Sequence, residues 1–256
     1  MNSLRTIAAL LCTVVLTACE KNAVQDITGS LPGARIKFFN FGVNAPSVNF
    51  YANTAKMTAI SSATGAESTA GVAYAGVGNN SLYSAIDPGQ YTFTARISAT
   101  VDKDLPISTL SATLADGKDY SFYMSGLYNT TSKNVEGFVI EDPLPATIDW
   151  ANGAVRFVNA ISNSQPMTLY AKNTVTMAEV PIGGATAYKG GTAFVTLPTG
   201  VYDLRARVTG AATDAIVRTA VSFVFGRTYT IAARGDITVT STTAAQRPIL
   251  DFTTNR

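Results

Sequence analysis

Hydrophobic and polar residues alternate with a period of two through much of this chain. Such alternation is typical of a β-strand that buries one face. Glycine and asparagine turn signals separate the alternating segments, which predicts many short strands and little helix. The clearest apolar positions are Tyr91, Phe93, Ala95 and Ile97 in one segment, and Tyr202, Leu204, Ala206 and Val208 in another.

Three blocks of sequence occur twice, in the same order. Residues 34–52 return at 154–171, residues 86–97 at 197–208, and residues 117–126 at 226–235. Repeats of this kind indicate two copies of one domain. We therefore predict an all-β fold with two tandem immunoglobulin-like, Greek-key β-sandwiches. The expected inward positions of two further strands in each copy are Ile36, Phe38, Val48 and Phe50, and Val155, Phe157, Met167 and Leu169.

A tyrosine follows a glycine turn at the same place in both copies. The segments are Leu114 to Tyr120 and Phe223 to Tyr229. They are similar to the tyrosine corner of Greek-key sandwiches, in which the phenol forms a hydrogen bond to the backbone a few residues upstream. We interpret Tyr120 and Tyr229 as structural rather than ligand-binding residues.

These blocks resemble the bacterial surface modules of the domain-of-unknown-function 4397 family. The resemblance covers both copies: an aliphatic-aromatic strand after a proline loop, a Gly-Tyr turn, and a Gly-x-x-Tyr-Ser/Thr segment. It implies an immunoglobulin-like sandwich without established catalytic residues. The chain departs from the family between Thr54 and Ile86, where the first copy is longer, and we expect a surface loop there.

The first residues read as a bacterial lipoprotein signal. A short apolar run after Arg5 ends in Leu16-Thr17-Ala18-Cys19, and a run this short is too small to span a bilayer. We expect cleavage before Cys19 and acylation of that residue, which would anchor the protein to a membrane. Cys12 lacks the small preceding residue that a cleavage site needs. Because Glu20 rather than Asp follows Cys19, we expect the outer membrane.

Composition and the repeats together set the expected boundaries. We assign a signal peptide to 1–18, a lipidated spacer to 19–32, the first sandwich to 33–144, a linker to 145–152, the second sandwich to 153–252 and a tail to 253–256. Trp150, the only tryptophan, falls in the linker, and we expect it to pack between the sandwiches.

Several kinds of chemistry lack the residues that they need. The chain has no histidine, and Cys19 would be its only cysteine after cleavage. Disulfides, thiolate or imidazole metal sites and His-dependent catalytic triads are therefore excluded. We expect no cofactor and no metal, including calcium. The glycine-rich run 76–80 has no following Lys-Ser/Thr, so we do not interpret it as a phosphate loop.

Carboxylate pairs are the remaining acid-base candidates. They are Asp102 with Asp104, Asp116 with Asp119, and Glu141 with Asp142, all in turn-like sequence. Glycoside cleavage needs two carboxylates across a cleft, one with a raised pKa, and exposed turns do not provide that environment. We predict that the protein is not an enzyme.

The two halves differ in charge. Residues 20–152 carry twelve acidic and eight basic side chains, whereas residues 153–256 carry five acidic and ten basic ones, eight of them Arg. Alternation places Arg205 and Arg207 side by side on the outer face of a strand. They are candidates for binding an acidic polysaccharide, a lipid headgroup or an acidic protein, the alternative being charge that protects an edge strand.

The predicted function is that of a non-catalytic, lipid-anchored envelope protein with a binding, adhesive or structural role. The expected partners are the membrane, through the lipid, and a polysaccharide or an envelope protein, with the chain a monomer. One alternative is a subunit of a larger envelope assembly, and a remote one is a carbohydrate-processing enzyme. Nucleic acid is disfavoured, because export removes the chain from the cytosol and the basic surplus is small.

Overall fold

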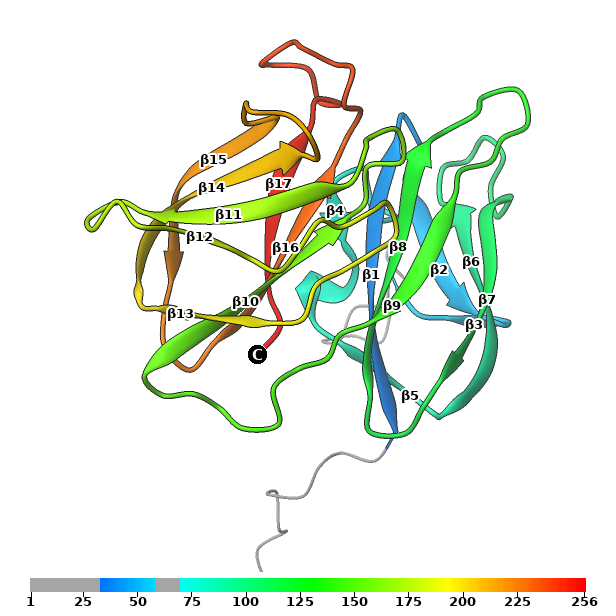
Figure 1. Ribbon diagram of the computed structural model, residues 1–256. Helices are drawn as coiled ribbons and strands as arrows, with labels where there is room; N and C mark the ends of the chain where they lie inside the picture. Colours follow the sequence, from blue (N-terminus) through cyan, green and yellow to red (C-terminus); the bar gives the residue numbers. More distant parts are fainter. Residues whose placement is uncertain (1–32, 59–69) are drawn as a thin grey trace, which may run out of the picture. The chain divides into compact units, whose positions relative to one another are not determined.

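Four β-sheets make up almost all the regular structure of the protein (Figure 1). The computed structural model describes residues 33–58 and 70–256. The sheets pair into two sandwiches, one from each half of the sequence, so the predicted all-β sandwich fold is confirmed. Cys19 and the expected signal and spacer lie outside the described residues.

The first sandwich consists of a five-stranded and a four-stranded sheet. The five-stranded sheet has the order β4-β1-β8-β9, with β5 also pairing with β1. Its strands are β1 (Ala34–Val43), β4 (Gly76–Val77), β5 (Ser84–Ile86), β8 (Asp119–Leu127) and β9 (Gly137–Glu141). The second sheet has the order β3-β2-β6-β7, with β2 (Val48–Ala52), β3 (Ala55–Lys56), β6 (Gly89–Ile97) and β7 (Pro106–Leu114).

The second sandwich has two four-stranded sheets. One has the order β13-β10-β16-β17, with β10 (Asn152–Asn159), β13 (Val195–Pro198), β16 (Thr228–Arg234) and β17 (Ile249–Thr254). The other has the order β12-β11-β14-β15, with β11 (Met167–Asn173), β12 (Glu179–Pro181), β14 (Gly200–Val208) and β15 (Ile216–Phe223).

Both sandwiches use the same strand pairing. The first strand of each runs parallel to a strand late in the same copy: β1 pairs with β8, and β10 with β16. The remaining pairs named by register are antiparallel, including β2 with β6 and β11 with β14. The internal repeat of the sequence therefore corresponds to a repeat of topology.

The alternating residues form the two sandwich cores, as predicted. Phe93, Ala95 and Leu204 are buried, while Tyr91 and Val208 are partly buried against the same cores. In the first core, the Phe38 ring stacks on Phe50 with a centroid distance of 5.3 Å. Burial of these large apolar side chains is the main source of stability in residues 33–58 and 70–256, which contain no cysteine.

A third apolar cluster joins the two sandwiches. Strand β1 is buried along almost its whole length, because Phe38 faces the first core and Phe39 faces the second sandwich. We call this contact the seam; its apolar members are Phe39, Phe41, Tyr123 and Phe138 from the first sandwich, and Val158, Ala160 and Ala232 from the second. Residues 33–256 accordingly form one compact unit.

The stretch between Thr54 and Ile86 is not simply a surface loop. Its described part forms β4, a short 3-10 helix, η2 (Gly78–Ser81), and β5, and β4 and β5 both pair with β1. Gly78 is buried, and an added Cβ would lie 2.7 Å from a Thr58 side-chain carbon. The loop prediction was wrong here because two- and three-residue strands are too short to show alternation.

Trp150 does not pack between the sandwiches. Its side chain is 72% exposed, and its ring lies over Gly226, where an added Cβ would be 3.0 Å from two ring carbons. The prediction was wrong because the seam is filled by residues of the strands, which leaves the linker side chain on the surface.

Candidate functional site

Arg205 and Arg207 lie side by side on β14, but they do not form a free basic face. Arg205 Nη1 donates to Asp214 at 2.6 Å, and Arg207 Nε donates to the other oxygen of the same carboxylate at 2.7 Å. Arg207 also holds Glu179 through two bonds, of 2.7 and 2.9 Å. An incoming anion would have to displace these carboxylates, so the predicted binding face is instead a mixed-charge cluster.

The pKa of Asp214 agrees with a carboxylate that is held by two arginines. Burial opposes ionisation of Asp214, but hydrogen bonds from Arg207 and Arg205 outweigh it and lower the pKa of the carboxyl group. The Arg207 guanidinium also lies 4.3 Å from the centre of the Tyr170 ring. Sequence periodicity located the arginines correctly, but their partners come from β12 and from the turn before β15, which alternation within β14 cannot predict.

Tyr120 and Tyr229 occupy equivalent places at the start of β8 and β16. The phenol oxygen of Tyr120 accepts the backbone N–H of Ala115 at 3.0 Å, and that of Tyr229 accepts the N–H of Val224 at 3.2 Å. Both rings are buried in their sandwich cores. Each hydroxyl thus binds the backbone five residues upstream, which is the hydrogen bond that a tyrosine corner requires.

Most of the carboxylates considered for acid-base chemistry have structural partners. Asp102 pairs with Lys133, Asp119 with Arg35 and Glu141 with Lys118, and Asp116 accepts the backbone N–H of Gly33. Asp142 is buried in an ion pair with Arg156. Among residues 33–58 and 70–256, acidic side chains form no cluster with metal-binding geometry.

A buried polar cluster lies within the seam. Arg156 of β10 donates to the carboxylate of Asp142 and, at 3.0 Å, to the carbonyl oxygen of Glu141, both of which belong to the first half of the chain. Asp142 also accepts the hydroxyl of Ser121 at 2.7 Å and that of Tyr83 at 2.6 Å. Buried charge is tolerated when it is paired and hydrogen-bonded in this way.

The surroundings of Tyr83 hold its hydroxyl in the neutral, donating form. Burial raises the pKa of Tyr83 well above its ordinary value, and the nearby negative charge of Asp142 raises it further. The phenol therefore stays protonated and can keep donating to the carboxylate. Tyr83 comes from the stretch that the sequence had assigned to a surface loop.

Lys37 of β1 reaches across the seam to the end of β17. Its Nζ donates to the carbonyl oxygen of Thr254 at 2.8 Å and to the Asn255 side chain at 3.3 Å. The ammonium group also lies 4.3 Å from the centre of the Tyr83 ring. Desolvation by burial lowers the pKa of Lys37 to about 8, although the charge of Asp142 works in the opposite direction.

Lys37 and Arg156 hold equivalent positions in the two copies. Lys37 lies opposite Ser121 in the β1–β8 pair, and Arg156 lies opposite Thr230 in the β10–β16 pair. Each is 1% exposed although it falls on the outward face of its sandwich. The sequence carries a signal for both residues, because each repeat has a basic residue at the same outward position. Alternation within one strand does not show that such a residue is buried.

Beside this cluster is an open pocket of about 450 Å³. We call it the seam pocket, because both sandwiches contribute to its walls. Its volume lies within the range of small-molecule sites, roughly 300–1,000 Å³. The lining residues are Lys37, Asn80, Ser81, Leu82 and Tyr83 from the first sandwich, and Arg227, Phe252, Thr253, Thr254, Asn255 and Arg256 from the second.

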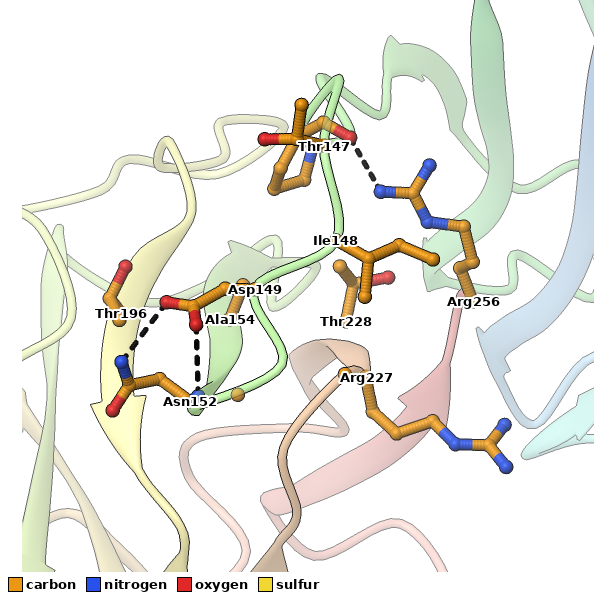
Figure 2. A pocket seen from close by; sticks show the side chains of 12 residues that line it. Thr147, Ile148, Asp149, Asn152, Ala154, Thr196, Arg227, Thr228 and Arg256 are labelled. Carbon is orange, nitrogen blue, oxygen red and sulfur yellow. Dashed lines mark hydrogen bonds between the residues drawn. The ribbon is translucent and has the colours of Figure 1, made fainter.

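A smaller pocket of about 210 Å³ lies under the linker and shares Arg227 and Arg256 with the seam pocket (Figure 2). Its one acidic residue, Asp149, accepts the side chain of Asn152 at 3.0 Å and the backbone N–H of Ala151 at 2.8 Å. The bond from Asn152 is the main reason that the pKa of Asp149 is lowered. In Figure 2 the guanidinium group of Arg227 points away from Asp149 and Asn152, and that of Arg256 points toward the linker near Thr147.

Comparison with known protein families gives a match in the second half of the chain. A model of the family described as "Domain of unknown function (DUF4397)" matches residues 153–255. The second sandwich matches one copy of this domain. The match agrees with the resemblance that we found in the sequence of that half.

Two further comparisons add little. No curated protein matches the chain. Among solved structures, a "putative cell adhesion protein" from Bacteroides ovatus is 10% identical with a TM-score of 0.24, over 89% of this chain and 97% of that one. At this TM-score the likeness carries no argument about function. Within the part of the chain that the structure describes, no helix is long and apolar enough to cross a bilayer.

Proposed function

We propose that this protein is a non-catalytic lipoprotein of the bacterial cell envelope, in which two sandwiches act together as one binding unit. Acylated Cys19 would hold it, with the outer membrane as the expected site. The observation that carries the binding role is the seam pocket, whose walls come from both sandwiches. A ligand there would contact both copies at once, which gives the duplication a functional reason.

The use of the carboxylates supports a role without catalysis. Acid-base catalysis needs a carboxyl group that faces a substrate and has a pKa suited to proton transfer. Asp119, Glu141 and Asp142 are instead held by Arg35, Lys118 and Arg156. These carboxylates therefore act as structural partners of basic side chains.

The repeated topology supports a common origin for the two copies. The first sandwich has the same central strand pairing as the second, and the three sequence blocks recur at equivalent strands. We propose that the first sandwich is a second, more divergent member of the family matched by residues 153–255.

The anchoring is tested by replacing Cys19 with Ser and expressing the full chain in a Gram-negative bacterium supplied with labelled palmitate. Wild-type protein should carry the label and sediment with outer membranes, whereas C19S should be unlabelled and leave the membrane fraction. Cys12→Ser is the matched control, because it removes the other cysteine of the chain. Equal labelling of C19S and wild type would refute the lipoprotein assignment.

A second candidate function is that of a subunit in a larger envelope assembly. Trp150 is 72% exposed and its ring lies against Gly226, and Phe225, the residue before Gly226, is 55% exposed. Large exposed apolar side chains that lie together are typical of a docking surface. Cross-linking in intact envelopes separates the two candidates: a partner lost in a Trp150→Ser/Phe225→Ser variant favours the assembly, and unchanged cross-links exclude this surface.

A further inference from the structure

The seam pocket gathers positive charge without acidic side chains in its wall. Of its lining residues, Lys37, Arg227 and Arg256 are cationic and none is Asp or Glu. The carboxylates that act on Lys37, Asp142 and Asp119, are themselves paired with Arg156 and Arg35. The side chains of the wall therefore carry a net positive charge, which attracts an anion.

Arg227 is the most available of the three cations. It lies exposed in the turn between β15 and β16. Among the described residues, none forms a hydrogen bond or ion pair with its guanidinium group, whereas Arg205 and Arg207 share three carboxylates between them. Its donors are free to bind a carboxylate or a phosphate in the bidentate geometry that arginine favours.

Arg256 is only partly satisfied. Its Nη2 donates to the carbonyl oxygen of Pro145 at 2.5 Å, but its buried Nε has no hydrogen-bond partner. The main-chain oxygen of Arg256 is already bonded to the N–H of Thr228 at 3.0 Å. Arg256 therefore adds positive charge to the pocket wall, with its guanidinium group tied to the linker.

The remaining wall suits a polar, ring-shaped ligand. Asn80 and Ser81 offer side-chain amide and hydroxyl groups, and Phe252 and Leu82 offer apolar surface, Leu82 being 68% exposed at the pocket. Sugars present both kinds of surface, because their hydroxyl groups lie around the edge of the ring and their C–H groups lie on its faces.

We infer that the seam pocket binds an anionic saccharide, with its carboxylate or phosphate group held by Arg227. This inference rests on the proposed binding function and names the ligand class for the same site. It also moves the anion site predicted from sequence away from Arg205 and Arg207, whose charges are paired with Asp214 and Glu179.

The test uses the full chain carrying Cys19→Ser, so that the protein is free of lipid, and isothermal titration calorimetry. Three probes are compared: trigalacturonate, glucose 6-phosphate and the neutral sugar galactotriose. An anionic probe should bind while galactotriose binds at least about tenfold more weakly, and added salt should weaken the anionic complex. Trigalacturonate binding alone would assign a carboxylate ligand, and glucose 6-phosphate binding alone a phosphate ligand.

Variants locate the site. Arg227→Gln should weaken the binding of the anionic probe by about tenfold or more, because a charge-assisted pair is lost, and Arg227→Lys should restore part of it. An Arg205→Gln/Arg207→Gln variant is the matched control and should bind as the parent does. Equal binding by Arg227→Gln and its parent, equal affinity for galactotriose, or no binding of either anionic probe at millimolar concentration would each overturn the inference. The anchoring is tested separately, so neither result decides the other.

Discussion

The guanidinium of Arg156, on the first strand of the second sandwich, is paired with the carboxylate of Asp142, which follows the last strand of the first. Their side chains are 1% and 0% exposed. Thr230 and the carbonyl oxygen of Glu141 accept further bonds from Arg156, and Ser121 and Tyr83 donate to Asp142. Two repeats that share a topology are thus joined by a buried charge pair, with one partner from each repeat.

Breaking this pair should destabilise the whole unit. Arg156→Met leaves the carboxylate of Asp142 buried and uncompensated, which costs about 3–5 kcal/mol in other proteins. We expect a corresponding fall in the free energy of unfolding, measured with urea. An Arg156→Met/Asp142→Leu variant should lose less free energy of unfolding than the two single variants lose together. Additive losses would mean that the two side chains do not act as a pair.

Lys37 should make stability depend on pH in the alkaline range. Its pKa is about 8 in the folded protein against an ordinary 10.5, so between these values the unfolded chain binds more protons than the folded one. Stability from this group is therefore gained as pH rises through 8. Between pH 7 and pH 10 we expect wild type to gain about 2–3 kcal/mol relative to Lys37→Met.

The stability of Lys37→Met is subtracted from that of wild type at each pH, because other groups also titrate at alkaline pH. Burial raises the pKa of Tyr83 and Tyr123, so these phenols remove stability chiefly above the ordinary tyrosine pKa of about 10, outside the range compared. A wild-type to Lys37→Met difference that stays constant from pH 7 to pH 10 would show that the ammonium group is not desolvated.

The two tyrosine corners should contribute about equally to the free energy of unfolding. Replacing Tyr120 or Tyr229 with Phe removes one hydrogen bond to a backbone N–H and leaves the packed ring in place. Each change should cost about 1 kcal/mol. Denaturant midpoints that do not move would disprove the corner assignment for that copy.

Gly117 and Gly226 form a matched pair for testing the environment of Trp150. Both have a positive φ, of 68° and 69°, so alanine should cost about 1–2 kcal/mol at either position. Nothing lies within 4 Å of a Cβ at Gly117, whereas the Trp150 ring lies 3.0 Å from one at Gly226.

Gly226→Ala should therefore also shift the fluorescence of Trp150, the only tryptophan of the chain. Gly117→Ala should destabilise the protein without that shift. Identical emission spectra for both variants would place the ring away from Gly226.

Much of the fold was accessible from sequence because it rests on local patterns. The alternation at Phe93 and Leu204 and the turn glycines Gly117 and Gly226 report on one strand or one turn at a time. The repeat then relates one copy to the other. These signals were sufficient for the longer strands and for the faces that form the two cores.

The seam pocket could not be predicted from sequence in this way, because it depends on contacts between distant segments. Arg227 and Arg256 give no local sign that they share a pocket with Lys37, which is some two hundred residues away. Tyr83 was hidden in a stretch whose strands are too short to alternate. Alternation predicted that Arg205 and Arg207 share a face, but it contains no information about Asp214 or Glu179.

Calorimetry of the full chain carrying Cys19→Ser tests most directly whether the two sandwiches act as one unit. The seam, with Phe39 and Tyr123 against Val158 and with Arg156 on Asp142, predicts one unfolding transition whose calorimetric enthalpy equals the van't Hoff enthalpy. Arg156→Met should lower the temperature of that transition. Two separate unfolding transitions of the Cys19→Ser protein, with neither temperature changed by Arg156→Met, would contradict the claim that the sandwiches unfold as one unit.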